Sequence, residues 1–300
     1  MLKHLLLLTS TTFIAGLALF FNGELNSKPG NNVNMLFQAE SGTAMTNNLQ
    51  LTERESRSFA VAGTPRINVE NFEGSITVRA WDQPEVNVVA VKQATDKQAM
   101  NNIRLQADQK DANVSVTTKF NGRERKMKIG GGDAYSKGAY IDLELNVPRN
   151  ANVNLSTGDG SLTISGVSGE LKLKTSDGAI QVRDGRGQLT ANTSDGRIQI
   201  VNFDGDVEAK DMGDQGINAE GRFAKFSATT GGGSIALSVP ADANVTIETD
   251  TANINNEGLA VTEEKLTSNA RRLKVGNGGN VFNLQTGVTG QVTLRRMNGS

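Results

Sequence analysis

Cysteine is absent from this 300-residue sequence, and histidine occurs once, as His4. Without cysteine the chain cannot form disulfides, thiolate zinc sites, thiol nucleophiles or a cysteine-linked lipid anchor. His4 precedes an apolar N-terminal run, so the rest of the chain has no imidazole. Ser-His-Asp triads, histidine general bases and histidine-ligated metals are therefore excluded from that part.

Aromatic residues are also scarce, at 5% of the chain, and the formal net charge is only −1. A near-neutral chain has no overall field that would attract nucleic acid. Trp81, Tyr135 and Tyr140 are the only Trp and Tyr residues and precede the repeated region, so an aromatic platform for sugars has little support. Glycine is abundant, with 33 residues, which favours a fold with many tight corners.

An uncharged apolar run follows Lys3 and spans residues 5–21. A basic start followed by an apolar stretch is typical of an export signal, and a helix over this run would be about 25 Å long, near the lower limit for crossing a bilayer. Residues 1–21 are therefore predicted to be a cleaved signal peptide or a retained membrane anchor. Both place the body outside the cytoplasm, in the periplasm or at the cell surface. Residues 22–57 are polar and aperiodic, which predicts a flexible linker.

Three copies of one turn motif lie 18 residues apart in the middle of the chain. The copies are Thr157-Gly158-Asp159-Gly160, Thr175-Ser176-Asp177-Gly178 and Thr193-Ser194-Asp195-Gly196. An alternating apolar pair follows each copy, as at Ile180 and Val182, and a second pair falls half a period later. This pattern predicts an all-β solenoid, a β-helix-like stack of short strands with rungs of about 18 residues. The threonines and the glycines are each expected to stack, with positive φ at the glycine corners.

The β-solenoid body is predicted to span residues 58–300. Its first part, 58–146, contains alternating strands, a hairpin-like turn at 71–74 and one short helix within 96–105, capped by Asp96. Regular repeats and a cap are expected over 147–300, where Val147-Pro148 begins the solenoid. The last alternating block, 276–296, is expected to supply closing rungs or a cap over exposed strand edges.

A basic cluster interrupts the strand pattern between residues 121 and 138. It contains Arg123, Arg125, Lys126 and Lys128, followed by three glycines. A phosphate-binding loop needs Gly-Lys-Ser/Thr leading into a helix, whereas a strand pattern follows here. A solvated hairpin tip is the simpler interpretation, and a site for an anionic ligand is the alternative.

Aspartate is the one ionisable residue that repeats within the turn motif, at Asp159, Asp177 and Asp195. Carboxylates stacked about 5 Å apart repel by roughly 1–3 kcal/mol, so some contact must offset the repulsion. The simpler interpretation is that each accepts backbone N–H bonds in its own turn, and the alternative is a column of calcium ions bridging the corners. Identical turns do not supply the two different carboxylates of a glycosidase. No catalytic residue, cofactor or further metal site is predicted.

The motifs also carry a family resemblance. Val147-Pro148 is followed by the turn-and-strand segments Thr175–Val182 and Thr193–Ile200, and residues 72–78 show a similar pattern. In these features the chain resembles the putative-adhesin family of bacterial envelope proteins, formerly a domain of unknown function, over about residues 60–296. The resemblance implies a surface-exposed, non-enzymatic β-solenoid, in some members linked to envelope stress, and it supplies no ligand or catalytic residues.

Together these features predict an exported, non-catalytic binding or adhesion module of the cell envelope. Its partner would be an envelope or surface ligand, protein or glycan, with the membrane contacted through residues 5–21 and no nucleic acid bound. Outward polar residues are either ligand contacts or solvated strand faces: Lys172, Lys174, Gln181, Arg183, Arg197 and Gln199. One alternative is a polysaccharide-active β-helix enzyme, which needs Arg or Lys and several carboxylates on one face. The other is a structural or regulatory envelope-stress protein that acts through its N-terminal anchor.

Overall fold

The computed structural model describes residues 33–34, 51–129, 132–287 and 289–297. Residues Asn32–Ser300 form one compact unit. The predicted signal or anchor at 1–21 and most of the predicted linker lie outside the described residues. Within the described part, no helix is long and apolar enough to cross a membrane.

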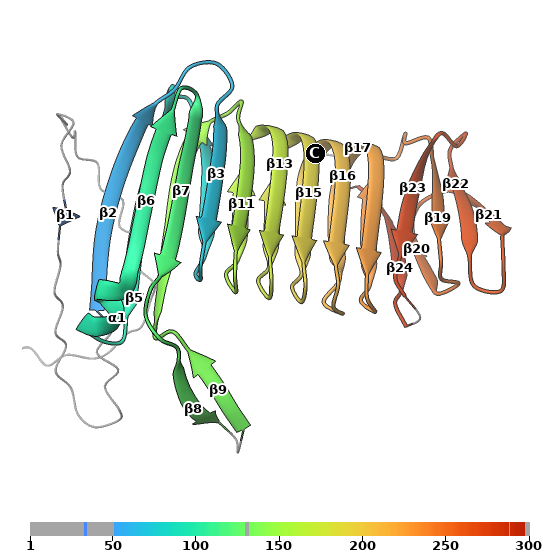
Figure 1. Cartoon of the computed structure of the whole chain (residues 1–300). Helices are drawn as coiled ribbons and strands as arrows, with labels where there is room; N and C mark the ends of the chain where they lie inside the picture. Colours follow the sequence, from blue (N-terminus) through green and yellow to red (C-terminus); the bar gives the residue numbers. More distant parts are fainter. Residues whose placement is uncertain (1–32, 35–50, 130–131, 288, 298–300) are drawn as a thin grey trace, which may run out of the picture. The chain divides into compact units, whose positions relative to one another are not determined.

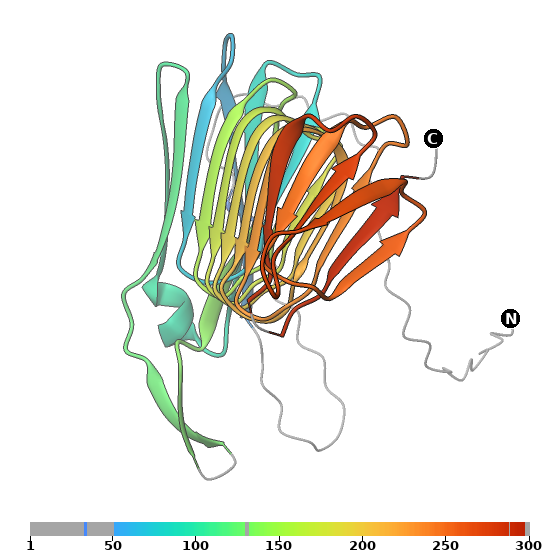
Figure 2. The same cartoon turned by 90° about the vertical axis from the view of Figure 1, so that its right-hand side faces the viewer.

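Two rows of strands face each other across a shared core, as Figures 1 and 2 show. The first row runs in the order β6 (Ile103–Lys110), β7 (Asn113–Phe120), β3 (Arg66–Asn71), β11 (Asn152–Thr157), β13 (Ser168–Thr175), β15 (Arg186–Thr193), β16 (Ile198–Asp211), β17 (Ile217–Thr230), β23 (Asn280–Gln285), β19 (Val245–Thr249), β22 (Arg271–Val275) and β21 (Val261–Lys265). The second row runs in the order β1 (Val33–Asn34), β2 (Leu51–Ala60), β5 (Glu85–Ala94), β10 (Ala139–Pro148), β4 (Ile76–Trp81), β12 (Leu162–Ser165), β14 (Ile180–Arg183), the first residues of β16 and of β17, β18 (Ile235–Val239), β24 (Val292–Arg296) and β20 (Ile254–Glu257).

One strand from each row, joined by a corner, makes a rung, and neighbouring rungs pair in parallel. Leu171 lies beside Leu189, and Leu189 beside Val207, at the predicted spacing of 18 residues. Ile198 lies beside Ile217, so the spacing grows to 19 where the loop before β17 is longer. The β-solenoid fold class predicted from the repeat is therefore confirmed.

The core lies between the two rows, where the alternating apolar side chains point inward. Leu162, Ile180 and Ile198 form one buried column, and each is 0% exposed. Each such side chain stabilises the fold by about 1.5–3 kcal/mol on burial. All the buried apolar residues come from positions between Val61 and Leu294, so the unit from Asn32 to Ser300 contains a complete core.

The solenoid begins earlier in the chain than predicted. Strands β3 and β4 do not pair with each other, so residues 71–74 form a corner and not a hairpin turn. Strand β3 pairs in parallel with β11 and β4 with β12, which makes β3–β4 the first rung. The segment from β5 to β10 is inserted after this rung, and this interruption hides the first rung from a search for a fixed period.

The C-terminal block also differs from the expected cap. Strands β23 and β24 form a rung that lies between β17–β18 and β19–β20. The rung that comes last in the stack, β19–β20, therefore comes earlier in the chain. Parallel neighbours need only matching strand faces, so the order along the chain is free to change.

Two details of the first part can be compared with their predictions. Helix α1 (Lys97–Asn102) is the predicted short helix, and the Asp96 carboxylate accepts the Ala99 N–H at 2.8 Å as its cap. Strand β2 begins at Leu51, so residues 51–57 are strand and not linker as predicted. Its inward positions include Glu53, Glu55 and Arg57, and such charged residues do not give the apolar alternation that marks a strand.

Candidate binding surfaces

The corner that carries the repeated turn is held by its threonines. Thr157, Thr175 and Thr193 are buried, and their hydroxyls donate to carbonyl oxygens of the preceding rung. The Thr175 Oγ1 lies 3.0 Å from the Gly158 oxygen and 2.8 Å from the Gly160 oxygen. Each threonine therefore satisfies corner carbonyls that would otherwise lack a partner in the dry interior.

The glycines of this corner stack as predicted, but for a different reason. Gly160, Gly178 and Gly196 are not among the positive-φ glycines, so the predicted left-handed conformation is wrong. A Cβ on Gly178 would lie 2.0 Å from the Gly160 carbonyl oxygen, and one on Gly196 would lie 2.1 Å from the Gly178 oxygen. The close approach of successive backbones excludes any side chain there.

The aspartates of the repeated turn point into solvent. Asp159, Asp177 and Asp195 are all exposed, one on each of three successive rungs. In the described part their carboxylates form no side-chain hydrogen bonds, so the predicted bonds to N–H groups of their own turns are not formed. The same part of the chain contains no group of three or more His, Cys, Asp or Glu residues suited to a metal. Calcium binding by this column stays a hypothesis.

Two residues at the ends of the threonine column were not predicted. Asn71 lies beside Thr157, and its amide donates to the carbonyls of Glu73, Gly74 and Ile141. Asp211 lies beside Thr193, is 0% exposed, and accepts the N–H groups of Gly213 at 3.0 Å and Gly216 at 2.8 Å. Asp211 follows Thr193 by 18 residues, so the repeat itself was a signal that could have identified it.

The opposite corner of the rungs forms a groove that runs across several rungs. The groove has a volume of about 790 Å³. Asp184 and Asn202 turn this corner with φ of 53° and 54°, in the left-handed region that Asn and Asp tolerate. Its wall carries one column of changing polarity, made of Ser168, Arg186, Asp204 and Arg222.

Arginine and aspartate side chains alternate along this corner groove. Arg186 donates to the Asp204 carboxylate at 2.8 Å, and Arg222 lies 3.9 Å from Asp242. At the end near the first rung, Arg149 donates to Asp82 at 2.6 Å, and this hydrogen bond and the guanidinium charge lower the pKa of the Asp82 carboxyl. These pairs are all exposed, so each adds little stability in water. Their charges are instead accessible to a ligand.

The outward residues predicted as contacts fall on two separate faces. Lys172 and Lys174 lie on β13 in the first row, and Lys172 pairs with Glu170 at 2.6 Å. Gln181, Arg183, Arg197 and Gln199 lie on or next to β14 and β16 in the second row. Gln181 donates to Gln199 on the next rung at 2.8 Å. The structure thus does not bring the six residues together into one site.

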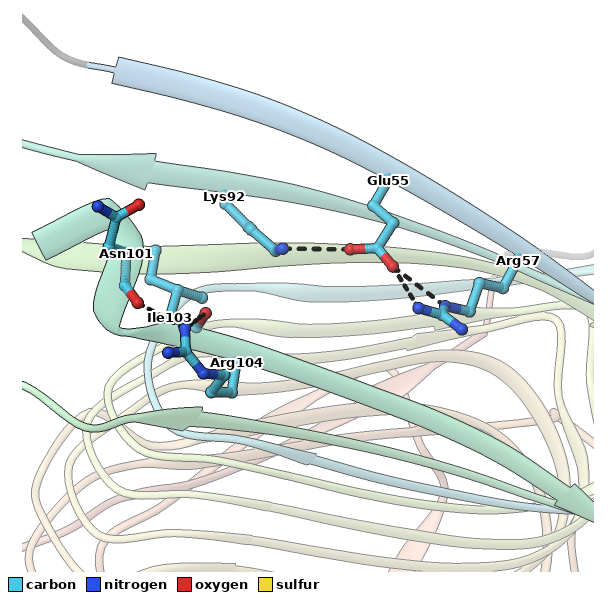
Figure 3. Close-up of polar contacts among 6 residues, drawn as sticks. All are labelled: Glu55, Arg57, Lys92, Asn101, Ile103 and Arg104. Carbon is cyan, nitrogen blue, oxygen red and sulfur yellow. Dashed lines mark hydrogen bonds and ion pairs between the residues drawn. The ribbon is translucent and has the colours of Figure 1, made fainter. Parts of the chain in front are cut away.

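A charged cluster lies inside the N-terminal end of the unit, as Figure 3 shows. Glu55 of β2 accepts from Lys92 of β5 at 3.1 Å and from the Nε of Arg57 at 3.1 Å. Partial burial alone would raise the pKa of Glu55, but the hydrogen bonds and charges of Arg57 and Lys92 together lower it. The cluster occupies inward positions of the end strands, where charges oppose pairing with a further strand.

Comparisons with known proteins agree on the fold. A family model described as Toastrack DUF4097 matches residues 38–295. A structure described as a putative lipid binding protein from Parabacteroides distasonis is 12% identical, covers 82% of this chain and 97% of its own, and has a TM-score of 0.42. A putative adhesin from Bacteroides fragilis is 11% identical, with coverages of 81% and 97% and a TM-score of 0.36. A putative cell adhesion protein from Clostridium sporogenes is 12% identical, with coverages of 81% and 100% and a TM-score of 0.35. No curated protein matches the chain.

Proposed function

The chain belongs to the Toastrack DUF4097 family, and we propose that its solenoid is a non-catalytic binding module of the cell envelope, with an adhesion-like role. The observation that carries the proposal is the corner groove, whose wall is built by residues of successive rungs. An extended ligand would lie along it, parallel to the direction in which the rungs stack.

The chemistry of the groove supports a polar, extended ligand. Its arginines lie at the rim with aspartate partners, so a ligand would exchange intramolecular ion pairs for its own charge-assisted hydrogen bonds. An exposed pair contributes little to folding, so this exchange costs little stability. A glycan or an extended peptide segment with both donors and acceptors fits these requirements.

Export and membrane attachment are part of the proposal. The support is in the sequence, where Lys3 and the apolar run at 5–21 precede a polar segment. With this arrangement the body would be held outside the cytoplasm, either by a retained anchor or after release by signal cleavage.

A binding experiment with two matched triple variants tests the proposal. Arg149→Gln/Arg186→Gln/Arg222→Gln alters the groove, and Lys172→Gln/Lys174→Gln/Arg183→Gln removes the same charge from the flat strand faces. The unit 32–300 would be sedimented with peptidoglycan sacculi and run through gels containing polygalacturonate or dextran. We expect binding to at least one of these polymers that is lost only in the groove variant. Loss only in the face variant would move the site to the strands, and binding to none would contradict a glycan-binding role.

One observation favours a second candidate, a polysaccharide-active enzyme. The groove brings together the residue types that such an enzyme would need, with Asp184, Asp204 and Asp242 near three arginines. The carboxylates of Asp204 and Asp242 are ion-paired, and Asp184 accepts from Asn202 at 2.7 Å. Incubation with acidic polysaccharides, followed by assays for new reducing ends and for unsaturated uronates, would reveal catalysis. Turnover that is lost in the groove variant would replace the non-catalytic proposal.

A further inference from the structure

One end of the compact unit carries a concentration of basic residues that the regular rungs do not share. Residues 119–137 include six Lys or Arg and two acidic residues, in a chain that has 31 basic and 32 acidic residues overall. Pairing between β6 and β7 brings the start of β6, just after α1, to the same end. The basic end is defined here by Lys97, Arg104, Lys119, Arg123, Lys126 and Lys137.

A like-charge pair lies at the centre of the basic end. Arg104 of β6 and Lys119 of β7 are directly opposite on an antiparallel pair, and both side chains are exposed. The Arg104 guanidinium donates to the backbone carbonyls of Asn101 and Ile103, as Figure 3 shows. In the described residues neither cation has a carboxylate partner. Like charges placed directly opposite destabilise a strand pair, and a bound anion would remove that cost.

The hairpin of β8 (Arg125–Ile129) and β9 (Gly132–Ser136) extends this end away from the core. It forms a two-stranded sheet of its own, with no pairing to either row among the described strands. Both views show it projecting beyond the stacked rungs on the side where α1 lies (Figures 1 and 2). An isolated two-stranded hairpin is marginally stable in water, so a surface against which it can lie would stabilise it.

The N-terminal part of the chain joins the body at this same end. Leu51, the first residue of β2, lies beside Ala94 of β5, and Ala94 lies beside Ala139 of β10. The base of the β8–β9 hairpin is therefore about 10 Å, or two strand spacings, from the point where the N-terminal segment reaches the body. Gly138 at that base accepts the Thr95 N–H at 2.9 Å, which fixes it to the end of β5.

From these observations we propose that the basic end is a docking surface for a bilayer that contains anionic lipids. Lipid phosphates would neutralise the Arg104–Lys119 pair, and the hairpin would lie along the headgroups. The regular rungs and the corner groove would then extend away from the bilayer. The inference uses none of the groove residues, so it can fail while the groove proposal holds.

Flotation with lipid vesicles tests this surface. The unit 32–300, which has a complete core and lacks the apolar run, would be mixed with vesicles of phosphatidylcholine alone or with added phosphatidylglycerol. We expect binding only to the anionic vesicles, weakened by high salt. The triple variant Arg104→Gln/Lys119→Gln/Arg123→Gln should bind on the order of 100-fold more weakly, since each cation near an anionic surface contributes about tenfold or slightly less.

The matched control is again Lys172→Gln/Lys174→Gln/Arg183→Gln, which changes the net charge equally at a distance from the basic end. Thermal unfolding of both variants checks that each remains folded. Retained binding by the control, together with no competition from inorganic phosphate at constant ionic strength, supports a lipid surface. Equal loss in the control would show that only net charge matters and overturn the proposal. Competition by inorganic phosphate would assign the site to free anions, and binding to neutral vesicles would also overturn it.

Discussion

The regular rungs and the N-terminal end satisfy their polar groups in different ways. In the rungs from β11 to β16, one buried threonine per corner donates to carbonyls of the preceding rung, and the same contact recurs with every repeat. At the N-terminal end the inward positions carry the ion cluster of Glu55, Arg57 and Lys92. The middle repeats one solution, whereas the end uses residues that occur only once.

This difference follows from what lies next to each strand. A strand in the middle has a neighbour on both sides, so its side chains meet copies of themselves and identical residues pack well. A strand at the end has one free edge, which would pair with other chains unless charges or a covering segment oppose it. Substitutions should therefore cost most in the middle corners, and contacts made by the end should depend more on pH and salt.

The largest effect is expected from Gly178→Ala. The new Cβ would lie 2.0 Å from the Gly160 oxygen, and that oxygen belongs to a backbone held between two rungs. We expect a loss of about 3 kcal/mol or more, or roughly 10 °C in the midpoint of thermal unfolding. The matched control is Gly232→Ala, whose Cβ would meet only the Thr289 hydroxyl at 3.2 Å. Equal midpoints for the two variants would mean that the corner can open without cost.

The next largest effect is expected from Asp211→Ala, at the place where the threonine column changes its chemistry. Removal of this buried carboxylate leaves the Gly213 and Gly216 N–H groups without their acceptor. The expected loss is about 2–3 kcal/mol, measured by chemical denaturation. Asp214→Ala, an exposed change in the same loop, serves as control and should stay within about 0.5 kcal/mol of the parent. An unchanged Asp211→Ala variant would indicate that water replaces the carboxylate.

The regular middle could be predicted from sequence because each residue there contacts its own repeat. The three turn motifs identified the rung length, the buried pairs and the threonine column. The first rung could not be found in this way, since the inserted β5–β10 segment separates β4 from its neighbour β12. The corner groove was missed for another reason. Its column changes residue type at every rung, and only the strand register shows that Ser168, Arg186 and Asp204 are neighbours.

The ion cluster of the N-terminal end predicts a pH-dependent effect for Glu55→Gln. The folded-state pKa of Glu55 lies below its ordinary value of 4.5, so its contribution is fully present above that value and is lost as the pH falls through the folded-state pKa. At neutral pH the variant should be less stable by about 1 kcal/mol, because two cations lose a charged partner. The difference should shrink once the pH falls below 4.5. Denaturation curves at several pH values measure this, and a constant difference would contradict the ionic role.

The smallest effect is expected at the exposed aspartates of the middle corners, where calcium should leave the unfolding midpoint unchanged. Asp159, Asp177 and Asp195 are exposed on separate rungs, and calcium requires six to eight oxygen ligands around one ion. The test is thermal unfolding of the unit 32–300 with excess calcium and with chelator. A site filled at about 100 times its dissociation constant would stabilise the fold by about 2.7 kcal/mol, which is readily measured. A rise of several degrees that disappears in Asp177→Asn would show that these turns bind calcium, and the repeated corner would then be a ligand site as well as a structural one.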